Sequence, residues 1–151
     1  MAQNRGKDFE NIVRESLNRL EDITVIRLYD QTMGYLGGRN ICDLIAYKYP
    51  TLYLIECKAV HGNRLSFSNI SENQWRGLDA ECINPGVKAG IVCWWIDHDV
   101  TRFIPIDVLW WKRDWGDKSI CYDDGNIHII DIPGIKKRVF FEYDFSVLWR
   151  Q

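Results

Sequence analysis

The sequence predicts a single α/β domain in which a mixed central β-sheet is flanked by helices. Three observations support this expectation. The length of 151 residues is typical of one domain, and a hydrophobic content of 46% is enough for a buried core. The hydrophobic patterns follow the order helix, strands, helix, strands. Because no repeat or linker divides the chain, residues 1–151 are expected to form one domain.

The first half of the chain carries the clearer patterns. Apolar residues recur at helical spacing over residues 7–20, and the β-branched residues 23–28 predict a strand. The glycine-rich residues 29–40 are expected to form a flexible connection. Two apolar strands follow at residues 41–47 and 52–58, and the short turn between them predicts an antiparallel hairpin.

The second half begins with a helix signal. Residues 59–70 are expected to form a loop. Ser71 and Gln74 then have the spacing of a capping box, in which the serine caps the helix and the glutamine bonds back. This helix should end near Ile83, before Asn84-Pro85-Gly86. The remaining patterns predict strands at 90–96 and 101–104, a short helix at 106–112, and strands near 127–132 and 139–143.

Charge and cysteine content limit the class of protein. The net charge of −2 gives no overall basic footprint for nucleic acid, although residues 1–77 are slightly basic and 78–151 acidic. The five cysteines show no C-x-x-C spacing, so a structural zinc site is not expected. There is no signal-peptide core, and no apolar run approaches the roughly 20 residues needed to span a bilayer. We expect a soluble, cytoplasmic protein with no membrane partner.

Polar residues interrupt the two apolar strands of the expected hairpin. Asp43 lies in the first strand, and Glu56 and Lys58 lie at the end of the second. Side chains alternate along a strand, so Glu56 and Lys58 should share a face that the hairpin can bring beside Asp43. Two adjacent carboxylates favour a bound Mg²⁺ or Mn²⁺, which with a lysine suits hydrolysis of a phosphodiester. The alternative is an ordinary salt bridge between Glu56 and Lys58 on a solvated face.

This arrangement resembles a known nuclease signature. Asp43 followed by Glu56-Cys57-Lys58 is similar to the D…(D/E)-x-K motif of the PD-(D/E)XK superfamily, which has a restriction-endonuclease-like fold. More narrowly, residues 6–10 and 65–70 resemble RecU-type Holliday-junction resolvases, and the similarity spans about residues 6–78. The chain departs from the pattern in having no proline before Asp43. Residues 29–40 are also short for the stalk that RecU-type enzymes insert into the junction.

The resemblance implies a role for each matching residue. Asp43 and Glu56 would be metal ligands, the Cys57 carbonyl would be a further ligand, and Lys58 would be the catalytic lysine. Two supporting catalytic residues are also implied: Glu10, the acid of the first helix, and Gln74, at the start of the second. Considered without the resemblance, Glu10 could equally form a surface ion pair with Arg14, and Gln74 could be only a capping residue.

Basic and polar residues near these motifs are candidates for contacts with DNA, although each could instead be a solvated surface residue. The candidates are Lys7, Arg14, Arg39, Asn40, Arg64 and Arg76. The tryptophan pairs Trp94-Trp95 and Trp110-Trp111 are expected in the core or at a dimer interface rather than in base stacking.

The function expected from the sequence is that of a Mg²⁺-dependent endonuclease, with Mn²⁺ as a possible substitute. It would resolve four-way DNA junctions by paired nicks, as a homodimer with two equivalent sites. Its small size suggests a phage or mobile-element protein acting in a bacterial host cell. Two alternatives are another nuclease of this superfamily acting on duplex or flap DNA, and a non-catalytic DNA-binding protein with the same fold.

Overall fold

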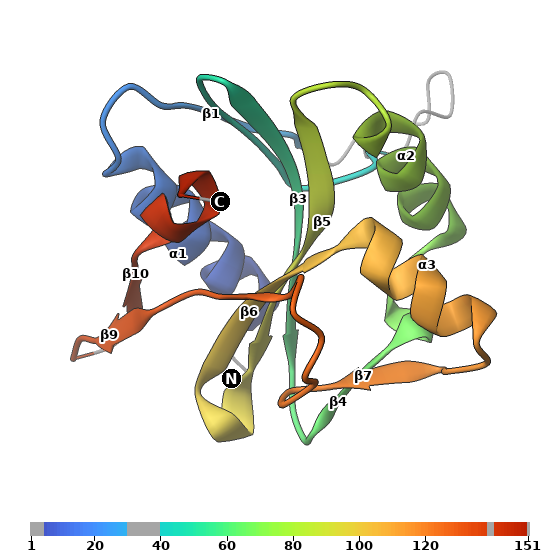
Figure 1. Cartoon of the computed structure of the whole chain (residues 1–151). Helices are drawn as coiled ribbons and strands as arrows, with labels where there is room; N and C mark the ends of the chain where they lie inside the picture. The colour runs from blue at the N-terminus through green and yellow to red at the C-terminus, as the bar shows by residue number, and fades with distance from the viewer. Residues whose placement is uncertain (1–4, 30–39, 139–140, 151) are drawn as a thin grey trace.

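The computed structural model describes residues 5–29, 40–138 and 141–150 of the chain. Its centre is a six-stranded mixed sheet with the strand order β1-β2-β3-β5-β6-β8, flanked by helices on both faces (Figure 1). The predicted α/β fold class is confirmed. No described helix is long and apolar enough to cross a membrane.

The first half of the chain builds one edge of the sheet. Helix α1 (Arg5–Asn18) buries Phe9, Val13 and Leu17 at helical spacing. Strand β1 (Thr24–Arg27) pairs with β2 (Leu44–Lys48), which pairs with β3 (Thr51–Val60), all antiparallel. The predicted hairpin is therefore correct. Asp43, however, lies just before β2 rather than within it, because regular pairing begins at Leu44.

The loop predicted at residues 59–70 is wrong. Strand β3 continues to Val60, and Arg64–Ser66 forms strand β4, which pairs with β7 (Ser119–Cys121) in a small separate sheet. A short 3-10 helix, η1 (Phe67–Asn69), then leads to α2. The pattern of β4 is too short to recognise in the sequence, since its partner strand lies more than 50 residues away.

The predicted capping box opens α2 (Glu72–Cys82), with both reciprocal bonds between Ser71 and Gln74 present. Strand β5 (Val87–Trp95) returns parallel to β3, so α2 lies in a strand–helix–strand crossover. The 3-10 helix η2 (Ile96–His98) connects β5 to β6 (Val100–Pro105), and these two strands pair antiparallel. Helix α3 (Ile106–Asp114) begins where the sequence predicts a short helix.

The C-terminal part differs most from expectation. The strand predicted near 127–132 shrinks to β8 (Ile130–Asp131). Of the strand predicted near 139–143, residues 141–143 form β10 (Phe141–Tyr143), and residues 139–140 lie outside the described residues. Strand β10 pairs with β9 (Gly134–Lys136), which the sequence did not predict. The last element of the described residues is the 3-10 helix η3 (Phe145–Trp149).

Two hydrophobic cores lie on opposite faces of the sheet. One packs α2 and α3 against the sheet around Trp75, Leu78 and Ile91. The other packs α1, β10 and η3 around Phe9, Ile55 and Phe145. Figure 1 shows this division, with α1 and the C-terminus on one side and α2 and α3 on the other. Along β3, Glu56 follows Ile55 and faces the α2 side, so the polar residues of the motif lie under the start of α2.

Candidate functional site

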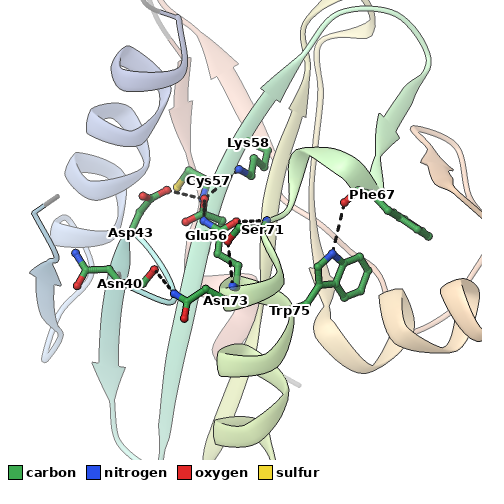
Figure 2. Close-up of polar contacts among 10 residues, drawn as sticks. Asn40, Asp43, Glu56, Cys57, Lys58, Phe67, Ser71, Asn73 and Trp75 are labelled. Atoms are coloured by element: carbon green, nitrogen blue, oxygen red, sulfur yellow. Dashed lines mark hydrogen bonds and ion pairs between the residues drawn. The ribbon is translucent and has the colours of Figure 1, made fainter. Parts of the chain in front are cut away.

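Two carboxylates meet where β2 begins and β3 passes it. The Oδ2 atom of Asp43 accepts a hydrogen bond of 2.9 Å from the backbone N–H of Cys57 (Figure 2). The backbone of Asp43 is itself held on both sides, because its N–H donates to Ile55 at 3.0 Å and its carbonyl accepts from Leu28 at 2.8 Å. Asp43 is therefore fixed by main-chain bonds to both neighbouring strands rather than by its side chain alone.

Glu56 is the most buried charged group of the site, with only 4% of its surface exposed. Its Oε2 atom accepts a hydrogen bond of 2.8 Å from the side-chain amide of Gln74 and lies 3.3 Å from the Lys58 ammonium. Glu56 and Lys58 thus share a face of β3, as the strand alternation predicts. The partly exposed lysine links the buried carboxylate to solvent, where a substrate phosphate could approach.

The second oxygen of Glu56 has no donor. Oε1 is buried and has no hydrogen-bond partner in the described part of the chain. Burial, followed by the charge of Asp43, raises the pKa of Glu56 from 4.5 to about 8. Since two ionised carboxylates are both acceptors, the pair is satisfied only when a proton or a cation lies between them. The unpartnered Oε1 atom is thus available to either a proton or a bound cation.

The ligands present suit a hard cation such as Mg²⁺. The described residues contain no group of three or more His, Cys, Asp or Glu side chains that could enclose a metal, so Asp43 and Glu56 would supply only part of its coordination shell. Mg²⁺ is commonly bound by one or two carboxylates, with water and substrate phosphates completing the octahedron. The N–H of Cys57 faces Asp43, and its carbonyl points to the same side of β3 and could add a third protein oxygen.

The two thiols beside these carboxylates do not suit a hard cation such as Mg²⁺. Burial raises the pKa of Cys42 to about 12 and raises the pKa of Cys57 as well, with the charges of Asp43 and Glu56 adding to the effect. These shifts favour the neutral thiols in the metal-free protein, and soft sulfur ligands do not suit Mg²⁺. Any contribution of Cys57 would therefore come from its backbone.

Glu10 lies on α1, which packs on the opposite face of the sheet from α2. Its carboxylate pairs with Arg27 of β1 at 2.7 Å, and both side chains are largely buried. The surface pair with Arg14 considered from the sequence is replaced by this contact between two elements. The charge of Glu10 is also one of the lesser causes that raise the pKa of Cys57, so the two residues interact electrostatically.

The candidate DNA contacts lie on several sides of the centre. Asn40 precedes Asp43, and its side chain donates to the backbone carbonyl of Tyr29 at 2.7 Å. Arg76 is 82% exposed on α2 and lies 3.9 Å from Glu72. Lys7 and Arg64 are exposed, and Arg14 is half-buried beside Arg19 and Arg27 in a groove between α1 and β1. Arg39 lies outside the described residues.

The two tryptophan pairs differ in their burial. Trp95 is fully buried and Trp94 packs on Phe9, so the first pair belongs to the core. Trp110 packs on Trp75, whereas Trp111 is 56% exposed.

Sequence reasoning missed two residues near the centre. Arg27 ends an exposed edge strand, where an arginine gives no signal of its ion pair with Glu10. Asn73 lies inside the capping-box segment, and its side chain donates to the backbone carbonyl of Asn40 at 3.3 Å (Figure 2). In the sequence, only the position of Asn73 next to Gln74 could have marked it as a site residue, and the capping-box pattern gives Asn73 no role.

Comparison with known proteins adds one result to this geometry. No protein-family model matches the chain, and no curated protein matches its sequence. Among solved structures, the chain is similar to Hjc, a Holliday junction resolvase from the archaeal hyperthermophile Archaeoglobus fulgidus. The TM-score is 0.51 at 21% sequence identity, over 68% of this chain and 78% of the other. The chain has a restriction-endonuclease-like fold.

The likeness concerns the fold alone, because the sequence identity is low. The mixed sheet of six strands with three α-helices agrees with the fold expected from the motif. It does not single out the RecU type, since the similar structure is an archaeal Hjc. The expected RecU relationship therefore stays a prediction from residues 6–78.

Proposed function

We propose that this protein is a divalent-metal-dependent endonuclease that hydrolyses DNA phosphodiesters at the centre formed by Asp43, Glu56 and Lys58. The observation that carries the proposal is the buried, unpartnered oxygen of Glu56 beside a second carboxylate. A purely structural ion pair with Lys58 would leave neither feature explained. The restriction-endonuclease-like fold and its likeness to a Holliday junction resolvase support the same chemistry.

Each residue has a definite task in this proposal. A divalent cation held by Asp43 and Glu56 would polarise a phosphoryl oxygen and help to deprotonate the attacking water. Lys58, 3.3 Å from Glu56, would orient that water and offset the negative charge that develops on the phosphate. Gln74 keeps Glu56 in place by donating to Oε2, which would leave Oε1 available to bind the cation.

The preferred substrate is a four-way DNA junction, cut by paired nicks. This part of the proposal rests on the motif resemblance and on the likeness to the archaeal Holliday junction resolvase. Two equivalent cuts require two equivalent sites, so we propose a homodimer acting in the cytoplasm. Mg²⁺ is the expected cofactor, because the protein offers few ligands, all of them oxygen.

The test compares substrates under one set of conditions. Synthetic four-way junction, linear duplex and flap DNA of the same length are incubated at equal concentration with Mg²⁺, Mn²⁺ or EDTA. We expect nicking of the junction in either metal and none in EDTA, and loss of nicking in Asp43→Asn with an unchanged circular dichroism spectrum. Full activity in EDTA would rule out the metal mechanism.

The same assay separates the other candidate functions. Faster cleavage of duplex or flap than of junction would assign the protein to a different nuclease activity of this fold. Junction binding without cleavage in any divalent ion would make it a non-catalytic DNA-binding protein. A gel-filtration mass of one chain at assay concentrations would contradict the dimer.

A further inference from the structure

Helix α2 contacts the segment before Asp43 along one side of its surface. Asn73 and Gly77 are four residues apart and therefore lie on the same face of the helix, one turn from each other. The Asn73 side chain donates to the carbonyl of Asn40, and Gly77 packs against Ile41. Both contacts fall within three residues of Asp43.

The packing at Gly77 leaves no room for a methyl group. A Cβ atom built at this position would overlap the Cγ2 atom of Ile41 and lie 2.7 Å from its Cβ atom. An isoleucine Cβ is fixed to the backbone and cannot swing away as the end of a long side chain could. Relief would require the backbone at Ile41 to move, or α2 to move away from it.

The adjacent face of α2 holds the other carboxylate. Gln74 donates to Glu56 at 2.8 Å, and Leu78, one turn later, is fully buried in the core beneath. Two adjacent faces of α2 thus contact the two proposed metal ligands, one directly and one through the residues that precede it. Residues 73 and 77 contact the chain leading to Asp43, and residue 74 contacts Glu56 itself.

We propose that α2 is the element that sets the spacing between the two carboxylates, with Gly77 and Asn73 as positioning residues that act on Asp43 through Ile41 and Asn40. This inference rests on the proposed function, because it assigns these residues to the metal site of that nuclease. Gly77 permits the close approach of the helix, and Asn73 fixes its register along the segment. Neither residue touches the substrate.

The relative strength of the two contacts follows from their surroundings. The hydrogen bond of Asn73 is exposed to solvent and 3.3 Å long, so water competes for it and its net contribution is small. The contact of Gly77 with Ile41 is a steric limit that solvent does not weaken. We therefore expect a larger effect from Gly77→Ala than from Asn73→Ala.

The choice of alanine at residue 77 separates positioning from stability. In a helix interior, alanine is favoured over glycine by roughly 0.5–1 kcal/mol. Helix propensity alone would make Gly77→Ala neutral or stabilising and leave cation binding unchanged. A displaced Ile41 would instead weaken cation binding while this gain in propensity partly offsets the loss of stability.

The experiment measures Mn²⁺ binding without DNA, together with junction cleavage and urea unfolding. Changes in the surroundings of metal ligands typically weaken metal affinity by about 10- to 100-fold, so we expect about tenfold weaker Mn²⁺ binding in Gly77→Ala. We also expect kcat to fall by about tenfold or more with KM changed less than about threefold. Asn73→Ala should weaken Mn²⁺ binding by about threefold, as loss of a marginal hydrogen bond predicts.

Two further variants serve as controls. Asp79→Ala brings a similar gain in helix propensity on the exposed face of α2 and should keep the wild-type Mn²⁺ affinity and kcat. Adding Ile41→Ala to Gly77→Ala removes the Cγ2 atom that the new methyl group overlaps, and should recover part of the lost Mn²⁺ affinity. Recovery would show that the overlap with Ile41, and not the change in helix propensity, causes the loss of Mn²⁺ affinity.

The outcomes distinguish the two proposals. Wild-type Mn²⁺ affinity and kcat in Gly77→Ala would overturn the positioning role and leave the nuclease proposal intact. If Gly77→Ala does not fold, the positioning role is tested by Asn73→Ala instead. Unchanged Mn²⁺ binding in the folded Asn73→Ala variant would overturn the positioning role of α2. A wild-type protein that binds no Mn²⁺ would overturn both proposals.

Discussion

Replacing Glu56 by glutamine should stabilise the metal-free protein while abolishing cleavage. The wild-type carboxyl is buried beside Asp43, and its pKa is raised from 4.5 to about 8. An amide of the same shape carries no charge, keeps an acceptor for Gln74 and Lys58, and adds donors that Asp43 can use. The substitution therefore removes an unfavourable charge that the proposed function requires.

The sign of the effect follows from proton binding. The folded state binds more protons than the unfolded state wherever the pH lies between the unfolded and folded pKa values. Wild-type stability should thus be highest below pH 4.5 with respect to this group, and should fall as the pH rises towards 8. At pH 7, the 2.5 units above the ordinary pKa correspond to about 3 kcal/mol at 1.36 kcal/mol per unit. Allowing for the Lys58 ion pair that glutamine loses, we expect Glu56→Gln to gain about 1–3 kcal/mol.

The assay is urea unfolding in EDTA at several pH values from 5 to 9. The difference between Glu56→Gln and wild type should grow with pH up to about 8 and then level off. Glu81→Gln, on the exposed surface of α2, serves as the matched control and should show no such pH dependence. A Glu56→Gln variant that is less stable than wild type throughout this range would refute the argument that the buried charge of Glu56 destabilises the metal-free protein.

Further substitutions test other contacts of the site and the core. Lys58→Met keeps the apolar stem and removes the ammonium, so the rate of cleavage should fall by about 100-fold or more. Mn²⁺ affinity measured by calorimetry should be unchanged or tighter, because a nearby positive charge is lost, and weaker Mn²⁺ binding would contradict the role given to Lys58. Gln74→Glu replaces the donor to Glu56 by a third acceptor, so the free energy of unfolding in EDTA at pH 8 should fall by about 1–2 kcal/mol. The loss should be recovered in Mn²⁺, and an equal loss in EDTA and in Mn²⁺ would contradict the proposed contact of residue 74 with a metal ligand. Gly90→Ala would place a methyl group against the Ile104 carbonyl and 2.9 Å from the Phe103 ring, so urea unfolding should show a loss of about 1–3 kcal/mol, and wild-type stability would disprove the close packing of β5 on β6.

The parts of the fold that the sequence predicts are those specified by local pattern. The hairpin of β2 and β3 follows from two apolar runs and a short turn, and α2 follows from a capping box whose two bonds connect residues three apart. The motif in β3 is equally local, since alternation alone places Glu56 and Lys58 on one face. These features depend on neighbours in the chain, and so they could be derived without a structure.

The remaining features depend on partners far away in the sequence. Strand β4 exists because β7 lies beside it, and Glu10 is turned towards Arg27 rather than Arg14 because α1 packs over β1. In each case a local rule was available and a tertiary contact overrode it. Strand β8 follows the same rule, since it pairs with β6 about 30 residues earlier in the chain. Strand β9 was missed for another reason, because three exposed residues leave no recognisable pattern.

Gln74 shows where local and tertiary information meet. The capping rule accepts either glutamate or glutamine at this position, because each offers an oxygen to the backbone N–H of the capping residue. In this protein the side-chain oxygen of Gln74 accepts from the Ser71 N–H at 3.0 Å, and its nitrogen donates to Glu56 at 2.8 Å. A glutamate could make the first bond and not the second. The start of α2 and the orientation of Glu56 thus depend on the oxygen and the nitrogen of one amide, so a residue of the capping box also couples the helix to the proposed metal site.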